Sequence, residues 1–86
     1  KNIPLEISII ALFSVPQSIS KRLKNSMLKG DILPTKKPDS DNIIKIILDA
    51  LNGVCYHDDS QVCKIYFEKK YSEIPKVEIT IKEIVL

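Results

Sequence analysis

Alternating apolar and polar positions predict three β-strands in this chain. Residues 3–13 place Ile or Leu at every second position from Ile3 to Ile9, and residues 10–13 are apolar throughout, so we expect residues 10–13 to be more fully buried. Residues 76–84 alternate most cleanly, with Val77, Ile79 and Ile81 on the inward face, and residues 61–71 alternate more weakly. A short turn at residues 72–75 separates the last two strands, so we expect them to pair as an antiparallel hairpin.

The segment after Pro16 predicts a short helix with few apolar positions. Ser18 or Ser20 is suited to cap its N-terminus, and Gly30, after Lys29, is suited to end it.

A second helix follows the loop 31–38, since Pro38 keeps the preceding residue out of helical geometry. Asp39 or Ser40 can cap it, and the helix is expected to end at Leu51 or Asn52. Apolar residues cover most of its circumference and therefore predict a largely buried helix: Ile43, Ile44, Ile46, Ile47, Leu48, Ala50 and Leu51.

The order strand, helix, helix, strand, strand predicts an α+β fold, with a small mixed or antiparallel sheet and two helices packed on one face. Eighty-six residues are enough for one domain, residues 1–86, with a marginal core that a second subunit would complete. The apolar fraction of 44% and charged fraction of 28% are typical of a soluble domain, and no apolar run reaches the ~20 residues of a membrane helix.

Charge is distributed unevenly along the chain, although the net charge is only +2. Five of the 11 acidic residues lie between Asp39 and Asp59, so the other 6 acids face 13 bases, a balance of +7. A basic body around an acidic spot suits a protein that holds a polyanion near a cation. The basic run of residues 21–24 is either an ordinary solvated helix face or a phosphate-contacting one.

Cys55 and Cys63 have no zinc-ligand spacing, and His57 is the only histidine, which argues against a zinc site. Two cysteines without a disulfide framework favour a reducing cytoplasm.

The acidic window has the residue types that metal-dependent phosphodiester hydrolysis needs. Asp39 and Asp41, two apart at a helix start, can share Mg²⁺, which takes one or two protein carboxylates and keeps positions for water and phosphate oxygens. Asp58 or Asp59 can add a third carboxylate. Lys45 lies one helical turn after Asp41, where its ammonium can reach a phosphate or an attacking water.

Each of these residues also has a purely structural explanation. Asp39 can cap the helix, Asp41 can complement the helix dipole, Lys45 can form an ion pair with Asp49, and the closing aspartates can be turn residues. A calcium loop is excluded because two isoleucines, at positions 43 and 44, stand where an oxygen ligand and a glycine are required. A glycosidase cleft is disfavoured because the chain has no Trp and few aromatic residues.

At these residues the sequence resembles the RusA family of Holliday junction resolvases, which prophages often carry. The resemblance rests on Lys37-Pro38-Asp39-x-Asp41-Asn42, Lys45, Leu48-Asp49-Ala50-Leu51-Asn52-Gly53 and Asp58-Asp59-Ser60-Gln61, and it continues weakly through Glu68-Lys69-Lys70-Tyr71. The flank from Ser18 to Lys37 is also similar.

The resemblance implies a homodimeric, Mg²⁺-dependent endonuclease, with Mn²⁺ as a possible substitute, that makes paired nicks in branched double-stranded DNA during recombination and repair. By position, Asp39, Asp41 and Asp59 would bind the metal, Asp58 would assist, and Lys45 would be the catalytic lysine. Asp49 matches the pattern and is interpreted as structural. The basic residues expected to contact DNA are Lys21, Arg22, Lys24, Lys36 and Lys37. Family members usually begin with a further strand and a basic loop, so we expect the chain to be incomplete at its N-terminus.

Two alternatives remain open beside a junction-resolving nuclease in the cytoplasm. One is a DNA-binding module of the same fold that no longer cuts. The other is a structural domain whose acidic window binds a basic partner, and it predicts no thermal stabilisation by Mg²⁺.

Overall fold

A computed structural model describes residues 2–85. The elements in chain order are β1 (Leu5–Ser14), α1 (Lys21–Lys29), α2 (Ser40–Leu51), the short 3₁₀ helix η1 (Asp59–Gln61), β2 (Val62–Ser72) and β3 (Lys76–Glu83). The three strands form one mixed sheet in the order β2-β1-β3, which together with two α-helices confirms the α+β class. Within the described residues, none of the helices is long and apolar enough to cross a membrane.

β1 is the central strand, and this arrangement corrects the expected hairpin. It pairs in parallel with β2 and antiparallel with β3, so β2 and β3 do not pair with each other. The reason lies in composition: β1 is the most apolar strand, whereas β2 and β3 carry the lysines and glutamates that suit the two edges of a sheet. The parallel pair requires a long crossover, and residues 15–61 with both α-helices supply it.

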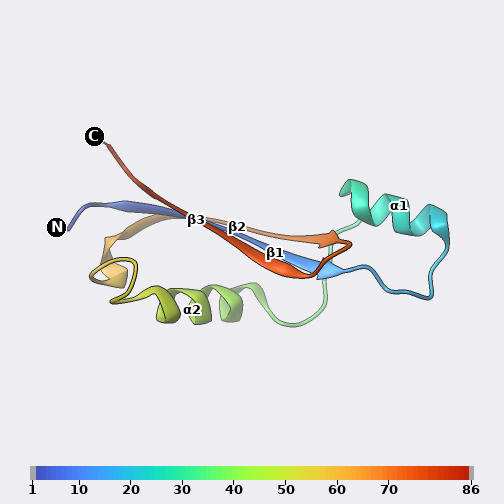
Figure 1. Cartoon of the computed structure of the whole chain (residues 1–86), viewed down its shortest axis with the longest axis horizontal. Coiled ribbons are helices and arrows are strands. Elements are labelled where there is room, and N and C mark those ends of the chain that lie inside the picture. The colour runs from blue at the N-terminus through green and yellow to red at the C-terminus, as the bar shows by residue number, and fades with distance from the viewer. Residues whose placement is uncertain (1, 86) are drawn as a thin grey trace.

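The core lies between β1 and α2. Leu5, Ile7, Ile9 and Ala11 are buried on one face of the sheet, as the alternation predicts. The opposite face of the sheet is not covered by a helix (Figure 1), which leaves Ile10 and Leu12 only partly buried. Phe13 is also only partly buried, so Ala11 alone in the stretch 10–13 is buried, contrary to the expectation.

α2 lies along the covered face of the sheet, but it is not largely buried as predicted. None of its residues is buried, and Ile46 is 67% exposed. A single sheet covers only one side of the helix, and residues on that side pack against the core: Ile44, Ile47, Leu48 and Leu51. α2 also leaves the edge of the sheet partly uncovered. Val77 and Ile79 of the edge strand β3 face α2 but stay 48% and 41% exposed.

α1 lies beyond the end of the sheet where β1 finishes, next to β2 (Figure 1). Ser20 caps it by accepting a hydrogen bond from the Leu23 N–H, and Gly30 ends it in the left-handed region, as predicted. This placement makes the molecule long, with extents of 51 × 24 × 17 Å. Its radius of gyration is 15.5 Å, against ~12 Å for a compact chain of this length.

Candidate active site and DNA-contacting surface

The first acidic pair stands at the N-terminus of α2. Asp39 occupies the N-cap position in an extended conformation, but its side chain makes no capping hydrogen bond, so a capping role does not account for it. Its carboxylate instead lies 3.4 Å from the Lys37 ammonium. Asp41 is exposed in the first turn, where one carboxylate oxygen accepts the Asn42 N–H at 2.9 Å. Both carboxylates are thus held at the positive end of the helix dipole and remain open to solvent.

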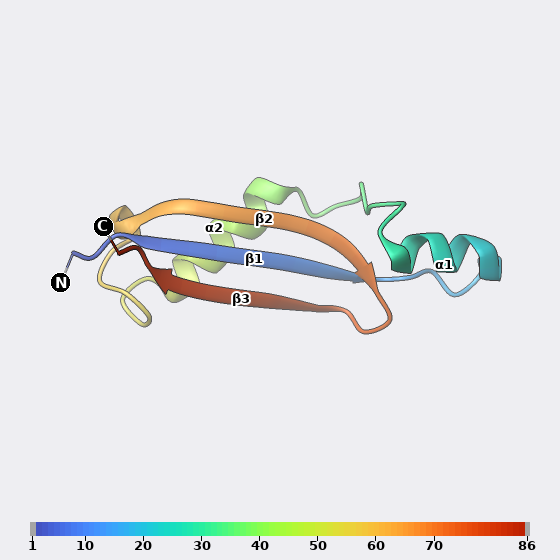
Figure 2. The ribbon, with the colours of Figure 1, turned by 90° about the horizontal axis from the view of Figure 1, so that it is seen from above.

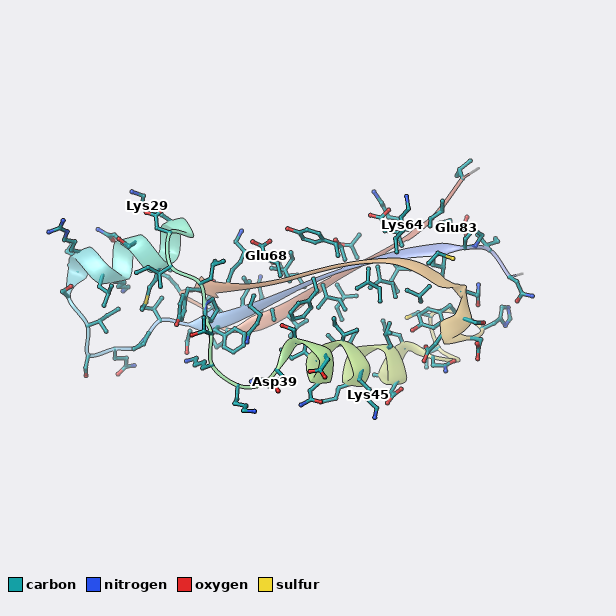
Figure 3. All side chains as sticks on the ribbon, turned by 180° about the vertical axis from the view of Figure 1, so that it is seen from behind. Lys29, Asp39, Lys45, Lys64, Glu68 and Glu83 are labelled. Atoms are coloured by element: carbon teal, nitrogen blue, oxygen red, sulfur yellow. The ribbon has the colours of Figure 1, made fainter. Side chains whose placement is uncertain are left out.

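Lys45 lies one turn further along α2 and points away from the sheet (Figure 3). The residue is exposed, and no salt bridge joins it to Asp49 or to any other residue in the range 2–85. The ion pair with Asp49, considered from the spacing alone, is therefore absent. The ammonium is free to contact an anion that approaches the solvent side of α2.

The second acidic pair opens η1, and its two members have different surroundings. Asp58 caps η1, accepting the Ser60 N–H at 2.9 Å, and the Gln61 side chain accepts the Asp58 N–H in return. Hydrogen bonds from the side chain and backbone of Ser60 hold the pKa of Asp58 below its usual value. Asp58 therefore has the local turn-forming role that was one of its two interpretations.

Asp59 is tied to the far end of α2 by a buried tyrosine. The Tyr56 hydroxyl lies 2.9 Å from an Asp59 carboxylate oxygen and 3.2 Å from the carbonyl oxygen of Leu48, and it can donate to either. Burial, and then the hydrogen bond to Asp59, raise the pKa of Tyr56 to about 12. Tyr56 was not identified from the sequence. The only signal there was its position two residues before Asp58.

The two acidic pairs therefore lie at opposite ends of α2, whose 12 residues span ~18 Å. Between Asn2 and Val85, no three Asp, Glu, His or Cys side chains come close enough to hold one metal ion. Asp39 and Asp41 are two residues apart, whereas this fold does not bring Asp59 to them. The assignment of Asp59 as a ligand of the same metal stays a prediction.

The predicted DNA-contacting residues gather at the end of the molecule where α2 begins. Lys21, Arg22 and Lys24 are exposed on α1, beyond the end of the sheet (Figure 1). Lys36 and Lys37 lie in the loop between the two helices, and the Lys36 ammonium stands 5.8 Å from the centre of a phenylalanine ring in β1. The basic residues and the first acidic pair therefore share one end of the fold.

Lys69 anchors this loop and was missed by the sequence analysis. Its ammonium donates to the carbonyl oxygens of Lys36 at 2.7 Å and Pro38 at 3.1 Å, and it lies 5.2 Å from the centre of the Phe13 ring. The sequence held one signal for such a role. Alternation in β2 places Lys69 on the same face as Phe67, the face toward α2, where a lysine is unusual. Lys69 thus fixes the backbone immediately before Asp39.

The chain belongs to the RusA family: the family model "Endodeoxyribonuclease RusA" matches residues 1–82. It is 42% identical over 83 residues to the protein YqaN of Bacillus subtilis (strain 168), an alignment that covers 94% of this chain. It is also 31% identical over 85 residues, 98% of this chain, to the crossover junction endodeoxyribonuclease rusA of Lactococcus phage r1t.

The chain spans 58% of the length of each of these relatives. No solved structure matches it significantly.

Proposed function

We propose that this chain is the catalytic part of a metal-dependent endodeoxyribonuclease that resolves four-way DNA junctions by paired nicks, in recombination and repair. The observation that carries the proposal is the acidic pair at the start of α2 in a member of the RusA family, with Lys45 one turn on and in no ion pair within residues 2–85. The phage relative described as a crossover junction endodeoxyribonuclease supports the substrate class. We also propose a cytoplasmic location for the protein.

Asp39 and Asp41 are the residues that fit Mg²⁺ or Mn²⁺. Their oxygen ligands suit a hard cation, they are open to solvent, and Mg²⁺ needs only one or two protein carboxylates because water and substrate fill its other positions. When bound, the metal would lower the pKa of a bound water and neutralise charge on the phosphate. Asp59, with Asp58 beside it, is proposed as the further acidic contribution that the family resemblance implies.

Lys45 is proposed as the catalytic lysine. Lys45 follows Asp41 by four residues, so it lies one turn further along the same side of α2, and no carboxylate in residues 2–85 forms a salt bridge with it. A cation fixed on a helix can stabilise the charge that develops on the phosphate oxygens without reorganising during the reaction.

DNA binding is assigned to the basic end of the molecule. DNA phosphates near the acidic pair can be contacted by the basic residues of α1 and of the loop before α2: Lys21, Arg22, Lys24, Lys36 and Lys37. Lys37 connects the basic residues to the acidic pair, since its ammonium lies 3.4 Å from the Asp39 carboxylate. Binding of a synthetic junction is expected to weaken by orders of magnitude between ~50 and ~200 mM salt.

The decisive experiment is Asp41→Asn, assayed on a synthetic four-way junction with Mg²⁺. Cleavage is expected to vanish while gel-shift binding survives, because the change removes a ligand charge and little volume. Asp31→Asn is the matched control: Asp31 is also exposed, and its ion-pair partner is Lys29 at 3.9 Å, away from α2. Full cleavage by Asp41→Asn, or equal loss in both variants, would end the assignment.

A second candidate is a DNA-binding module of this fold that no longer cuts, favoured by the separation of Asp59 from Asp39 and Asp41. Gel shift and cleavage measured on one sample distinguish it from the nuclease, since a binding module shifts the junction and leaves it intact. A Mg²⁺-induced thermal shift that Asp41→Asn abolishes argues against both this module and a purely structural domain.

A further inference from the structure

A pocket of about 450 Å³ opens beside the first acidic pair, on the α2 side of the sheet. α2 crosses the sheet obliquely, from β2 toward the edge of β3, so its first turns leave the start of β3 uncovered (Figure 2). Val77 at that start is 48% exposed, and it lines the pocket together with Ile43 of α2. Pro38, which directly precedes Asp39, also lines the pocket. The pocket thus adjoins a carboxylate proposed to hold the metal, and its volume falls in the ~300–1,000 Å³ range of small-ligand sites.

The lining is mostly apolar and contains one aromatic ring, that of Phe13 at the end of β1. The ring is only partly buried, and the ammonium of Lys36, another residue of the lining, stands 5.8 Å from its centre. A second ammonium, that of Lys69, lies 5.2 Å from the same ring but is not part of the lining. The exposed Lys36 is therefore the cation that a flat ligand in the pocket would displace from the ring.

Lys36 is also a cation without an acidic partner. No salt bridge in residues 2–85 includes it, whereas Lys76, the other lysine of the lining, stands 3.3 Å from the Glu78 carboxylate. A ligand that suits this lining has a flat apolar body for the pocket and an anionic group for Lys36. A nucleotide combines the two, since its base has an aromatic face and its phosphate is an anion.

Lys69 holds one wall of the pocket in place before any ligand arrives. It donates to the carbonyl oxygens of Lys36 and Pro38, and both of these residues line the pocket. Ordering the loop in advance lowers the entropy cost of binding.

We propose that the pocket takes one unstacked nucleobase from the branch point of the DNA, stacked on Phe13, while Lys36 binds the phosphate of the same nucleotide. The proposal rests on the proposed DNA substrate and adds a base-binding site to it. Leaving the stack costs least for a base whose stacking or pairing is already interrupted, as at a branch point. Stacking of a base on an aromatic ring is stronger than the contact of an exposed lysine with that ring, so the base takes the place of the Lys36 ammonium.

An amide NMR titration tests the pocket without DNA or metal. Deoxyadenosine monophosphate is expected to shift the backbone amide signals around Phe13 and Val77, whereas deoxyribose phosphate, which lacks the base, leaves them in place. Phe13→Leu keeps an apolar side chain but removes the ring, and it should abolish the shifts. Tyr66→Leu is the matched control, because it removes an exposed ring from the opposite face of the sheet. Equal shifts from both compounds, or shifts confined to α1, would overturn the proposal.

A junction with a fluorescent adenine analogue at the branch point tests the same step on DNA, without metal so that no cleavage occurs. The emission of such an analogue rises when it leaves the stack, so wild type and Phe13→Tyr are expected to raise it and Phe13→Leu is not. Phe13→Leu should also weaken junction binding about tenfold and leave duplex binding unchanged, because a duplex keeps its bases stacked. Val77→Phe fills the pocket while Phe13 stays in place, and it should have the same effect as Phe13→Leu.

Neither measurement depends on hydrolysis, so the pocket and the nuclease can fail separately. If wild type cleaves junctions but raises the emission no more than Phe13→Leu does, the proposed function stands and the base-binding pocket is wrong. Shifts that require the base, in a chain that does not cleave, would support the pocket and contradict the nuclease.

Discussion

Tyr56→Phe removes one hydroxyl from the buried link between Asp59 and the end of α2. The lost hydrogen bond to a carboxylate is worth ~1.5–3 kcal/mol. We expect about 1.5 kcal/mol in the free energy of unfolding at pH 7, because Asp59 is partly exposed and water can replace the hydroxyl.

The pH dependence of this loss is the sharper test. The pKa of Tyr56 is raised from 10.0 to about 12 in the folded protein, so the unfolded chain loses the proton first as pH rises. The stabilisation is fully present below pH ~10 and disappears as pH approaches ~12. Between pH 9 and pH 11 the wild-type free energy of unfolding should fall by on the order of 1 kcal/mol more than that of Tyr56→Phe.

Urea denaturation followed by circular dichroism at pH 7, 9, 10 and 11 measures both quantities. The difference in free energy of unfolding between wild type and Tyr56→Phe should narrow clearly between pH 7 and pH 11. Tyr66→Phe is the matched control, since its hydroxyl donates to Glu68 on the exposed face and its loss should change stability by less than ~0.5 kcal/mol. A gap that is constant from pH 7 to pH 11 would refute the assigned role of the Tyr56 hydroxyl.

Three further substitutions test the fold around the candidate site. Ile7→Ala empties the fully buried centre of β1 and should cost ~2–5 kcal/mol by thermal or urea unfolding; a loss below ~1 kcal/mol would mean that the core lies elsewhere. Lys69→Met keeps the side-chain stem but removes the contacts to the loop carbonyls, so we expect a loss of ~1–2 kcal/mol and faster amide exchange in residues 36–38; unchanged exchange would contradict the anchoring role. Gly30→Ala places a Cβ at φ +91 and should cost ~1 kcal/mol by urea unfolding, while a stabilised variant would show that the left-handed cap is not required.

Local elements could be predicted from the sequence because their signals are local. Ser20 and Gly30 bound α1 as expected, and α2 ends at Leu51, just before the Asn-Gly pair. The order of the strands could not be predicted in this way. A short turn favours a hairpin between β2 and β3. Which strand is central depends instead on the relative apolar content of all three, and β1, the most apolar, takes the central position.

The arrangement of the candidate site residues could be predicted only where it depends on local geometry. The structure places Asp39 and Asp41 at the start of α2, where the sequence puts them, and their role as metal ligands stays a prediction. The distance from either residue to Asp59 depends on where the chain after α2 turns back, and a buried tyrosine decides that point. Lys69 escaped notice for a similar reason, since its partners Lys36 and Pro38 lie more than 30 residues earlier in the chain.

The central position of β1 has a consequence for biosynthesis. The ribosome completes the most apolar strand by residue 14, but its two neighbours are complete only at residues 72 and 83. Until then, the two strands that flank β1 in residues 2–85 are incomplete, and they begin only at Val62 and Lys76. Such late, non-local pairing slows folding and exposes an aggregation-prone segment in the nascent chain. We therefore expect arrest of synthesis before β3 emerges to leave an unfolded chain that depends on chaperones.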